Sequence, residues 1–163
     1  MARRRALVGR HDQTAADTER SDVEEAVPLP KLRILLVEDS AANRKLTLAI
    51  LAREGQSAVV AVNGRRAVEL CARETFDLVL MDVQMPEMDG LEATAAIRAA
   101  ERESGRGRRL PIVAMTAHVL HGDREVCIEA GMDDYVSKPI RRRDLARALA
   151  RAAAATGAAA RAT

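Results

Sequence analysis

A chain of 163 residues with 48% hydrophobic content can bury one core, and no stretch of it is long and apolar enough to cross a membrane. Aromatic residues make up 1% of the chain, which argues against single-stranded nucleic-acid binding through stacked rings. The 26 basic and 24 acidic residues almost balance, and the arginine clusters at residues 3–5, 102–109 and 141–143 lack the aromatic neighbours of a nucleic-acid site. We therefore interpret these clusters as solvated surface.

The two ends of the chain differ in composition from its middle. Residues 1–30 have no sustained hydrophobic period, and a basic start is followed by an acidic stretch and by Pro28-Leu29-Pro30. This composition predicts a disordered leader, and the lack of an apolar h-region argues against a secretory signal. Residues 31–153 are expected to form one domain, and residues 154–163 an alanine-rich tail.

Within that domain, short apolar runs alternate with segments of helical period. The runs that predict strands are residues 34–37, 57–62, 78–81, 110–115 and 135–136. Helices are expected after Ser40, after Asn63-Gly64, over residues 90–103 and 118–130, and after the arginines at 141–143. Because the strands carry few polar positions and the connections are short, the sequence predicts an α/β fold with a doubly wound, five-stranded parallel sheet and five helices on its two faces.

Polar residues follow four of the five predicted strands: Glu38 and Asp39 the first, Asp82 the third, Thr116 the fourth and Lys138 the fifth. Parallel sheets bind ligands beyond the carboxyl ends of their strands, so we expect these residues to meet at one edge. Three carboxylates there repel one another unless one is protonated or a hard cation lies among them, and oxygen ligands favour Mg²⁺. An aspartate beside Mg²⁺, a lysine and a hydroxyl donor is suited to accept a phosphoryl group, with Asp82 as the nucleophile.

The two cysteines, Cys71 and Cys127, form no Cys-x-x-Cys pair, and both fall inside helical patterns. We interpret them as free core thiols in a reducing cytoplasm, since a redox switch requires an exposed thiol of low pKa.

Four sequence runs resemble the receiver domain of two-component response regulators. They are LVEDS at 36–40, LMDVQMPEMDG at 80–90, IVAMTA at 112–117 and GMDDYVSKP at 131–139. Four motifs in the right order make the resemblance specific, and it covers about residues 32 to 153. It implies a flavodoxin-like receiver fold and a cytoplasmic phosphoprotein that carries an aspartyl phosphate in phosphorelay signal transduction.

The resemblance also implies a role for each matching residue at the strand ends. Asp82 matches the phospho-acceptor, which is loaded from a phosphohistidine of a histidine kinase or a histidine phosphotransfer protein. Glu38 and Asp39 match the acidic pair at the Mg²⁺ site, where Asp82 and the backbone carbonyl of Gln84 would be further ligands. Lys138 matches the lysine that binds the phosphoryl oxygens.

Other matching positions concern the response to phosphorylation. Thr116, which would also bind the phosphoryl group, and Tyr135 match the switch pair, whose hydroxyl turns toward the phosphoryl group while the ring swings inward. Gln84 and His118 occupy positions that resemble those tuning phosphoryl lifetime. The basic loop at residues 104–109 resembles an insertion of receivers in hybrid sensor kinases.

These parallels imply a protein-binding module and not an enzyme, with only self-directed phosphoryl transfer and autodephosphorylation as its chemistry. The residues after Lys138 suffice for one helix and a tail, so we expect no DNA-binding domain and an output through another protein. A phosphatase-like, Mg²⁺-dependent enzyme with an aspartate nucleophile stays open, although such enzymes have an acid where this chain has Gln84. A pseudo-receiver that binds partners without phosphorylation also stays open, as do the cognate kinase, a homodimer through the last helix, and a place within a longer hybrid kinase.

Overall fold

The computed structural model describes residues 28–117 and 121–158 of the protein. In these residues the strands are β1 (Ile34–Val37), β2 (Ala58–Ala61), β3 (Leu78–Asp82), β4 (Ile112–Thr116) and β5 (Asp134–Ser137). The helices are α1 (Ala41–Arg53), α2 (Gly64–Arg73), α3 (Gly90–Ser104), α4 (His121–Glu129) and α5 (Arg142–Thr156). Most of the predicted leader, the end of the predicted tail and His118 lie outside the described residues.

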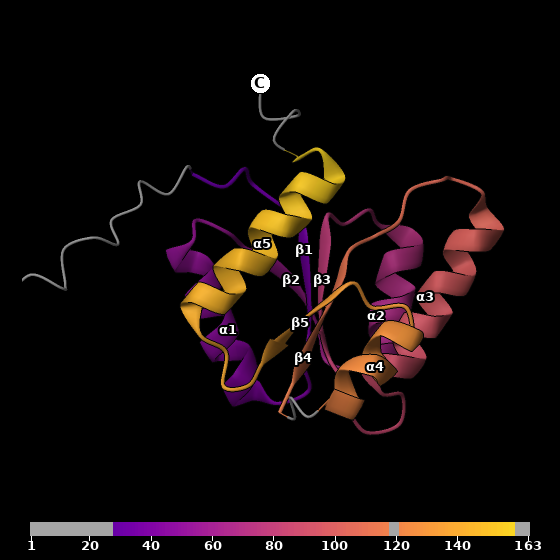
Figure 1. Ribbon diagram of the computed structural model, residues 1–163, viewed down its shortest axis with the longest axis horizontal. Coiled ribbons are helices and arrows are strands. Elements are labelled where there is room, and N and C mark those ends of the chain that lie inside the picture. Colours follow the sequence, from indigo (N-terminus) through magenta and orange to yellow (C-terminus); the bar gives the residue numbers. More distant parts are fainter. Residues whose placement is uncertain (1–27, 118–120, 159–163) are drawn as a thin grey trace, which may run out of the picture.

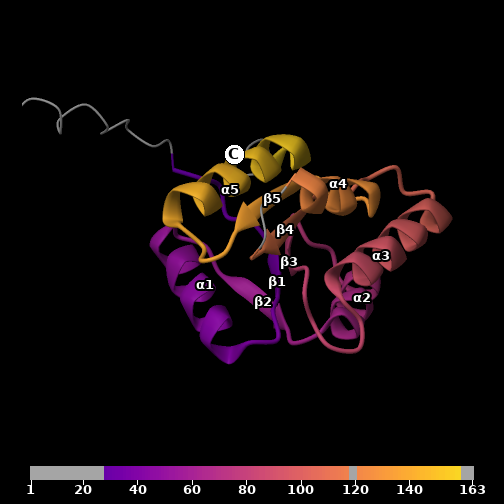
Figure 2. The same ribbon diagram turned by 60° about the horizontal axis from the view of Figure 1, so that its bottom comes forward.

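The five strands form one parallel sheet in the order β2-β1-β3-β4-β5, which confirms the predicted fold class. The order reverses direction at β1 and β3, as it does in doubly wound sheets. The carboxyl ends of the strands lie at the lower edge of the molecule in Figure 1, and Figure 2 brings this edge forward. Every polar residue that follows a strand is therefore delivered to the same edge.

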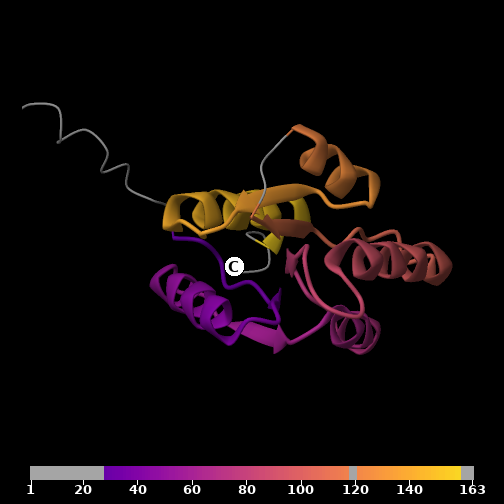
Figure 3. The same ribbon diagram turned by 90° about the horizontal axis from the view of Figure 1, so that it is seen from below.

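Helices cover both faces of the sheet, with α1 and α5 on one face and α2, α3 and α4 on the other (Figure 3). Successive side chains of β1 supply both cores because they point to opposite faces. Leu36 packs in the core with Leu51 of α1 and Leu149 of α5, whereas Leu35 packs in the core with Ile97 of α3. Both β1 leucines are fully buried. This double burial explains why the strands show no polar alternation.

Three helices begin at polar caps in the segments that follow β1, β2 and β3. The Ser40 side chain accepts a hydrogen bond from the Asn43 amide at the start of α1. The Asn63 side chain accepts one from the Arg66 amide at 2.8 Å, which confirms that Asn63-Gly64 begins a helix and not a hairpin. Asp89 forms a reciprocal capping box at the start of α3. These caps fix where each helix leaves the edge that carries the polar residues.

The ends of some elements differ from the predicted ones. β2 is shorter than the predicted residues 57–62, and Val62 beyond its end is 49% exposed. The last helix passes residue 153, where we placed the domain boundary, and Ala158 beyond it is buried in the same core as Leu149. At the other end, Pro30 accepts a hydrogen bond from the buried Gln56 side chain, so ordered chain precedes residue 31. None of the described helices has the length and apolar character that crossing a membrane requires.

Both cysteines are free thiols, as predicted, but only Cys127 is fully buried, while Cys71 is partly exposed. The reason is that Cys71 faces the cavity between α2 and α3 and not the closed interior.

The arginine cluster at residues 102–109 is exposed, as interpreted from the sequence, but two of its members also make ion pairs that the sequence did not predict. Arg108 pairs with Asp77 at 3.0 Å, and Arg109 pairs with Asp133 at 2.8 Å. The same Asp133 also pairs with the buried Arg98 of α3 at 2.7 Å. These ion pairs fasten the loop to the sheet edge opposite the carboxyl ends, which a charge count along the sequence does not reveal.

Candidate functional site

Asp82 occupies the end of β3, with only 3% of its surface exposed. Its Oδ1 lies 2.9 Å from Lys138 Nζ and accepts a hydrogen bond from the Gln84 amide at 3.2 Å. Its Oδ2 makes neither of these contacts. The carboxylate is thus held on one side by a cation and a backbone donor, and the second oxygen is the one available for chemistry.

Lys138 connects two carboxylates that come from different strands. Its ammonium lies 2.8 Å from Glu38 Oε2, beside the 2.9 Å contact with Asp82. The other oxygen of Glu38 accepts hydrogen bonds from the Ser40 amide and from the Asn43 side chain. Within the described chain Glu38 Oε2 is buried and, apart from the ion pair, accepts no hydrogen bond. A buried carboxylate oxygen with Lys138 as its one ion-pair partner has a lone pair left to bind a further cation.

The carboxylates of Glu38, Asp39 and Asp82 form a group whose ligand atoms lie within 4.8 Å of one another. Two of the three are buried and Asp39 is exposed, so the group opens to solvent on one side. Oxygen donors alone, with one open side, fit a hard divalent cation such as Mg²⁺ that keeps several waters. The predicted meeting of these residues at one edge is what the fold produces.

The charges at the edge shift the pKa values of its groups in opposite directions. Burial raises the pKa of Asp82 from 3.8 to about 6, and Glu38 adds to this effect while Lys138 opposes it. Burial also disfavours ionised Glu38, but contacts with Lys138 and the Ser40 amide outweigh it and hold the Glu38 pKa below its usual 4.5. Burial likewise opposes the charge on Lys138, yet the two carboxylates outweigh it and raise the Lys138 pKa. Glu38 and Lys138 are therefore the firmly ionised pair, and Asp82 is the group whose charge responds to its surroundings.

Thr116 and Tyr135, the predicted switch pair, lie on the neighbouring strands. Thr116 ends β4, is half-buried, and its carbonyl accepts a hydrogen bond from the Lys138 amide at 2.7 Å. Tyr135 lies on β5, and the guanidinium of Arg124 on α4 lies 5.5 Å from the centre of its ring. His118 lies outside the described residues, so its predicted position is untested.

Two residues that support the acidic edge were not singled out from the sequence. Arg44 of α1 donates to the backbone carbonyls of Glu38 and Asp39, at 3.0 and 2.7 Å. Asn43 donates to the Glu38 side chain. The sequence could have indicated both residues, because side chains in the first turn after the Ser40 cap lie near the end of the preceding strand.

Comparison with known proteins decides the family. The profile of the response regulator receiver domain family matches residues 34–150. The chain belongs to this family. The receiver is 48% identical over 114 residues to the sensor protein GacS of Pseudomonas syringae pv. syringae, an alignment that covers 70% of this chain and 12% of GacS. It thus spans a small part of the length of the curated relatives it matches.

Solved structures of other receivers agree with the fold. The receiver domain of a sensor histidine kinase from Pseudomonas aeruginosa, solved with a magnesium ion in its active-site cleft, has a TM-score of 0.65 and 43% identity, covering 75% of this receiver and 95% of that chain. The receiver domain of Ssk1 from Saccharomyces cerevisiae was crystallised with the histidine phosphotransfer protein Ypd1. It has a TM-score of 0.68 and 31% identity, and the match covers 74% of this receiver and 88% of that chain. The protein is a receiver of two-component signalling, and nothing among these relatives supports the phosphatase-like alternative.

Replacing Lys138 with methionine is expected to raise the pKa of Asp82 above its value of about 6. The ammonium is what opposes the effects of burial and of Glu38 on this carboxyl, so its loss leaves those effects unbalanced. The carboxyl chemical shift of Asp82, followed by NMR against pH in the absence of divalent cations, measures the change. Arg141→Met, which removes an exposed cation near the start of α5, is the control and should leave the titration unchanged. A titration midpoint in the Lys138 variant at or below that of the wild type would contradict the assignment.

Proposed function

We propose that this receiver accepts a phosphoryl group on Asp82 from the phosphohistidine of a histidine kinase or a histidine phosphotransfer protein, and that it signals by changing a protein-binding surface. The observation that carries the proposal is the placement of Asp82 Oδ1 against Lys138, with Oδ2 outside that contact, inside a group of three carboxylates. Support comes from the family, whose members include the receiver crystallised with a phosphotransfer protein.

In the proposed transfer, Asp82 Oδ2 forms a bond to phosphorus while the bond between phosphorus and the donor histidine nitrogen breaks. The electron pair of that bond leaves with the imidazole nitrogen. Lys138 binds a phosphoryl oxygen through its ammonium, and Thr116 binds another through its hydroxyl. Fixing these groups before the reaction stabilises the charge that spreads over the phosphoryl oxygens.

We infer that Glu38, Asp39, Asp82 and the Gln84 carbonyl would hold Mg²⁺ at this edge. A bound Mg²⁺ would neutralise charge on the phosphoryl oxygens. The magnesium ion in the receiver from Pseudomonas aeruginosa supports this assignment. The chemistry of this receiver is then limited to transfer onto and hydrolysis from its own aspartate, with Gln84 and His118 proposed to tune the lifetime of the phosphate.

Incubation with acetyl phosphate and Mg²⁺ tests the proposal, with intact mass spectrometry as the readout. We expect one phosphoryl group per chain, loss of loading in EDTA, and no turnover of phosphomonoesters such as nitrophenyl phosphate. Transfer from a phosphorylated histidine phosphotransfer protein tests the proposed donor. Continuous release of phosphate from a phosphomonoester would contradict the proposal and favour the phosphatase-like alternative.

We also propose that this receiver meets its partners in the cytoplasm. It is further proposed to form a homodimer through α5, which sedimentation of the phosphorylated and unphosphorylated forms would test.

We further propose that phosphorylation favours a conformer in which Tyr135 is buried. The half-buried position of Tyr135 and the Arg124 contact support this conformational change, because part of the ring can still become buried and Arg124 stabilises its present position. NMR spectra with and without beryllofluoride test the change: identical shifts for Tyr135, α4 and α5 would refute it.

Arg124→Gln is expected to shift Tyr135 toward the inward position even without phosphorylation. A cation over a half-buried ring near the surface contributes roughly 0.5–1 kcal/mol, so the shift in the equilibrium should be a few fold. The ring chemical shifts of Tyr135 in the unphosphorylated protein measure it. Arg143→Gln, an exposed arginine on α5, is the control, and an unchanged Tyr135 spectrum in the Arg124 variant would contradict the prediction.

A further inference from the structure

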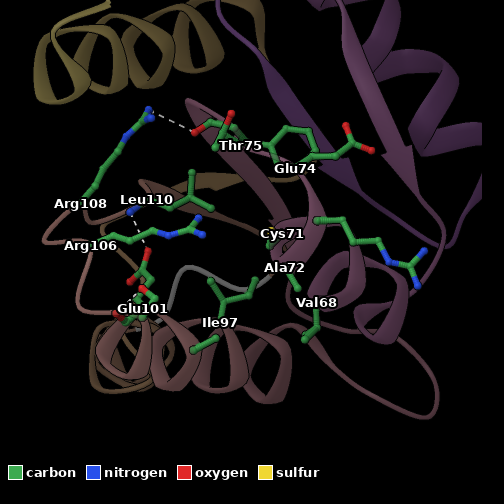
Figure 4. A pocket seen from close by; sticks show the side chains of 14 residues that line it. Val68, Cys71, Ala72, Glu74, Thr75, Ile97, Glu101, Arg106, Arg108 and Leu110 are labelled. Carbon is green, nitrogen blue, oxygen red and sulfur yellow. Dashed lines mark hydrogen bonds between the residues drawn. The ribbon is translucent and has the colours of Figure 1, made fainter.

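A cavity of about 400 Å³ lies on the face of the sheet that α2 and α3 cover, near the edge opposite the carboxyl ends of the strands. The C-terminal halves of α2 and α3 form two of its walls, and the segment from Ser104 to Leu110 closes a third (Figure 4). This segment contains the basic loop at residues 104–109, which takes no part in the phosphorylation site. The cavity therefore belongs to a different part of the receiver and is separated from Asp82 by the length of the strands.

Half of the 14 residues that line this cavity are apolar, and the other half are charged or carry a hydroxyl group. Val68 and Cys71 of α2 face Ile97 of α3 across it, and Phe76 and Leu110 lie toward the sheet. Burial, assisted by the nearby Glu101, raises the pKa of the Cys71 thiol to about 12, so the thiol stays neutral at physiological pH. Cys71 is thus part of an apolar wall and not a reactive thiolate.

The carboxylates at the rim already have partners. Glu74 pairs with Arg33, and Glu101 accepts hydrogen bonds from the buried Arg98 and from the Leu110 amide. Their charges are therefore neutralised within the fold.

Three arginines also line the cavity, and only one of them is paired. Arg108 pairs with Asp77 and donates to the Phe76 carbonyl. Arg73 and Arg106 have no carboxylate within 4.0 Å anywhere in the described chain, and both are exposed. In Figure 4, Arg106 extends from the loop toward the middle of the cavity. Among the residues that the structure describes, the cavity is thus lined by two arginines without a carboxylate partner, beside the apolar side chains.

We propose that this cavity binds a small amphipathic anion, a molecule with an apolar body and one carboxylate or similar anionic group. The volume lies within the range of small-molecule sites, which combine apolar side chains with polar groups that orient the ligand, and this cavity has both. The apolar body would contact Val68, Ile97 and Leu110, and the anionic group would bind the guanidinium groups of Arg73 and Arg106. The basic loop at residues 104–109 would take part in binding, since it supplies one wall of the cavity and one of the two cations.

An NMR titration of the full chain with phenylbutyrate and with its uncharged analogue phenylbutyramide tests the proposal. Saturable shifts are expected for amides of α2, α3 and residues 104–110, with the anion binding about fivefold more tightly than the amide because exposed ion pairs contribute up to about 1 kcal/mol. The double variant Arg73→Gln, Arg106→Gln should lose that preference while still binding both probes weakly. Ala100→Phe, which fills the cavity from α3, should abolish binding of both probes.

Arg102→Gln is the matched control, because Arg102 belongs to the same basic cluster but does not line the cavity. This variant should keep the full preference for the anion. No saturable shift, equal binding of the two probes, or a preference that survives the double arginine variant would each overturn the proposal. Loading of Asp82 by acetyl phosphate should be unchanged in the arginine variants, so the outcome is independent of the proposed phosphorylation.

Discussion

Asp82→Asn is expected to abolish loading by acetyl phosphate completely. An amide oxygen is too weak a nucleophile to attack phosphorus, while asparagine keeps the shape of the side chain and its contact with the Gln84 amide. Intact mass after incubation with acetyl phosphate and Mg²⁺ measures the loss. Asp89→Asn is the control: this carboxylate caps α3 and lies outside the acidic group, so loading should remain. Full loading of the Asp82 variant would refute the assignment of the acceptor.

The same variant is also expected to remove a dependence of stability on pH. The pKa of Asp82 is raised from 3.8 to about 6, so between these values the folded protein binds more protons at this site than the unfolded chain does. Its contribution therefore destabilises the wild type progressively as pH rises through this window, by up to about 3 kcal/mol. In EDTA, the Asp82→Asn variant should exceed the wild type in free energy of unfolding by more at pH 7 than at pH 4. Urea denaturation at the two pH values measures this, and a difference that does not grow with pH would contradict it.

Much of this site could be predicted from the sequence, because the geometry of a parallel sheet determines where its residues lie. Buried strands without alternation imply a parallel sheet, and a parallel sheet brings its carboxyl ends together, so Glu38, Asp82 and Lys138 had to share an edge. Which atoms meet could not be predicted in this way. The bridge by Lys138 between Glu38 Oε2 and Asp82 Oδ1 depends on side-chain conformations from three strands, and these are set only by packing.

The features that sequence reasoning missed depend on contacts between residues far apart in the chain. Arg98 looks like one charged position on a helix, yet it is buried and binds Asp133 and the carbonyls of Leu110 and Gly131. The arginines at 108 and 109 look like solvated charge until Asp77 and Asp133 are placed beside them. From the sequence alone, Asp89-Gly90 indicates an N-cap followed by a flexible hinge, whereas the fold packs Gly90 tightly against the Asp82 backbone.

Gly90→Ala is expected to lower the free energy of unfolding by about 3 kcal/mol and to impair loading of Asp82. A Cβ at this position would lie 2.1 Å from the backbone carbonyl oxygen of Asp82 and 3.0 Å from the Met81 side chain. Since the Asp82 oxygen belongs to the backbone of a central strand, it cannot rotate away, and the start of α3 or the end of β3 must move. Urea denaturation and the acetyl phosphate assay measure the two effects.

Gly122→Ala is the matched control for this prediction. Gly122 lies in α4, and a Cβ added there would meet no atom within 4 Å, so alanine should leave stability unchanged or raise it by up to about 1 kcal/mol. If the Gly90 variant were as stable as the Gly122 variant, the close approach between α3 and β3 would not be the constraint we infer. If it were destabilised but still loaded at the wild-type rate, the contact would support the fold without positioning the acceptor. Reduced stability together with slower loading is the result that links the packing of Gly90 against the Asp82 backbone to the geometry of the phosphorylation site.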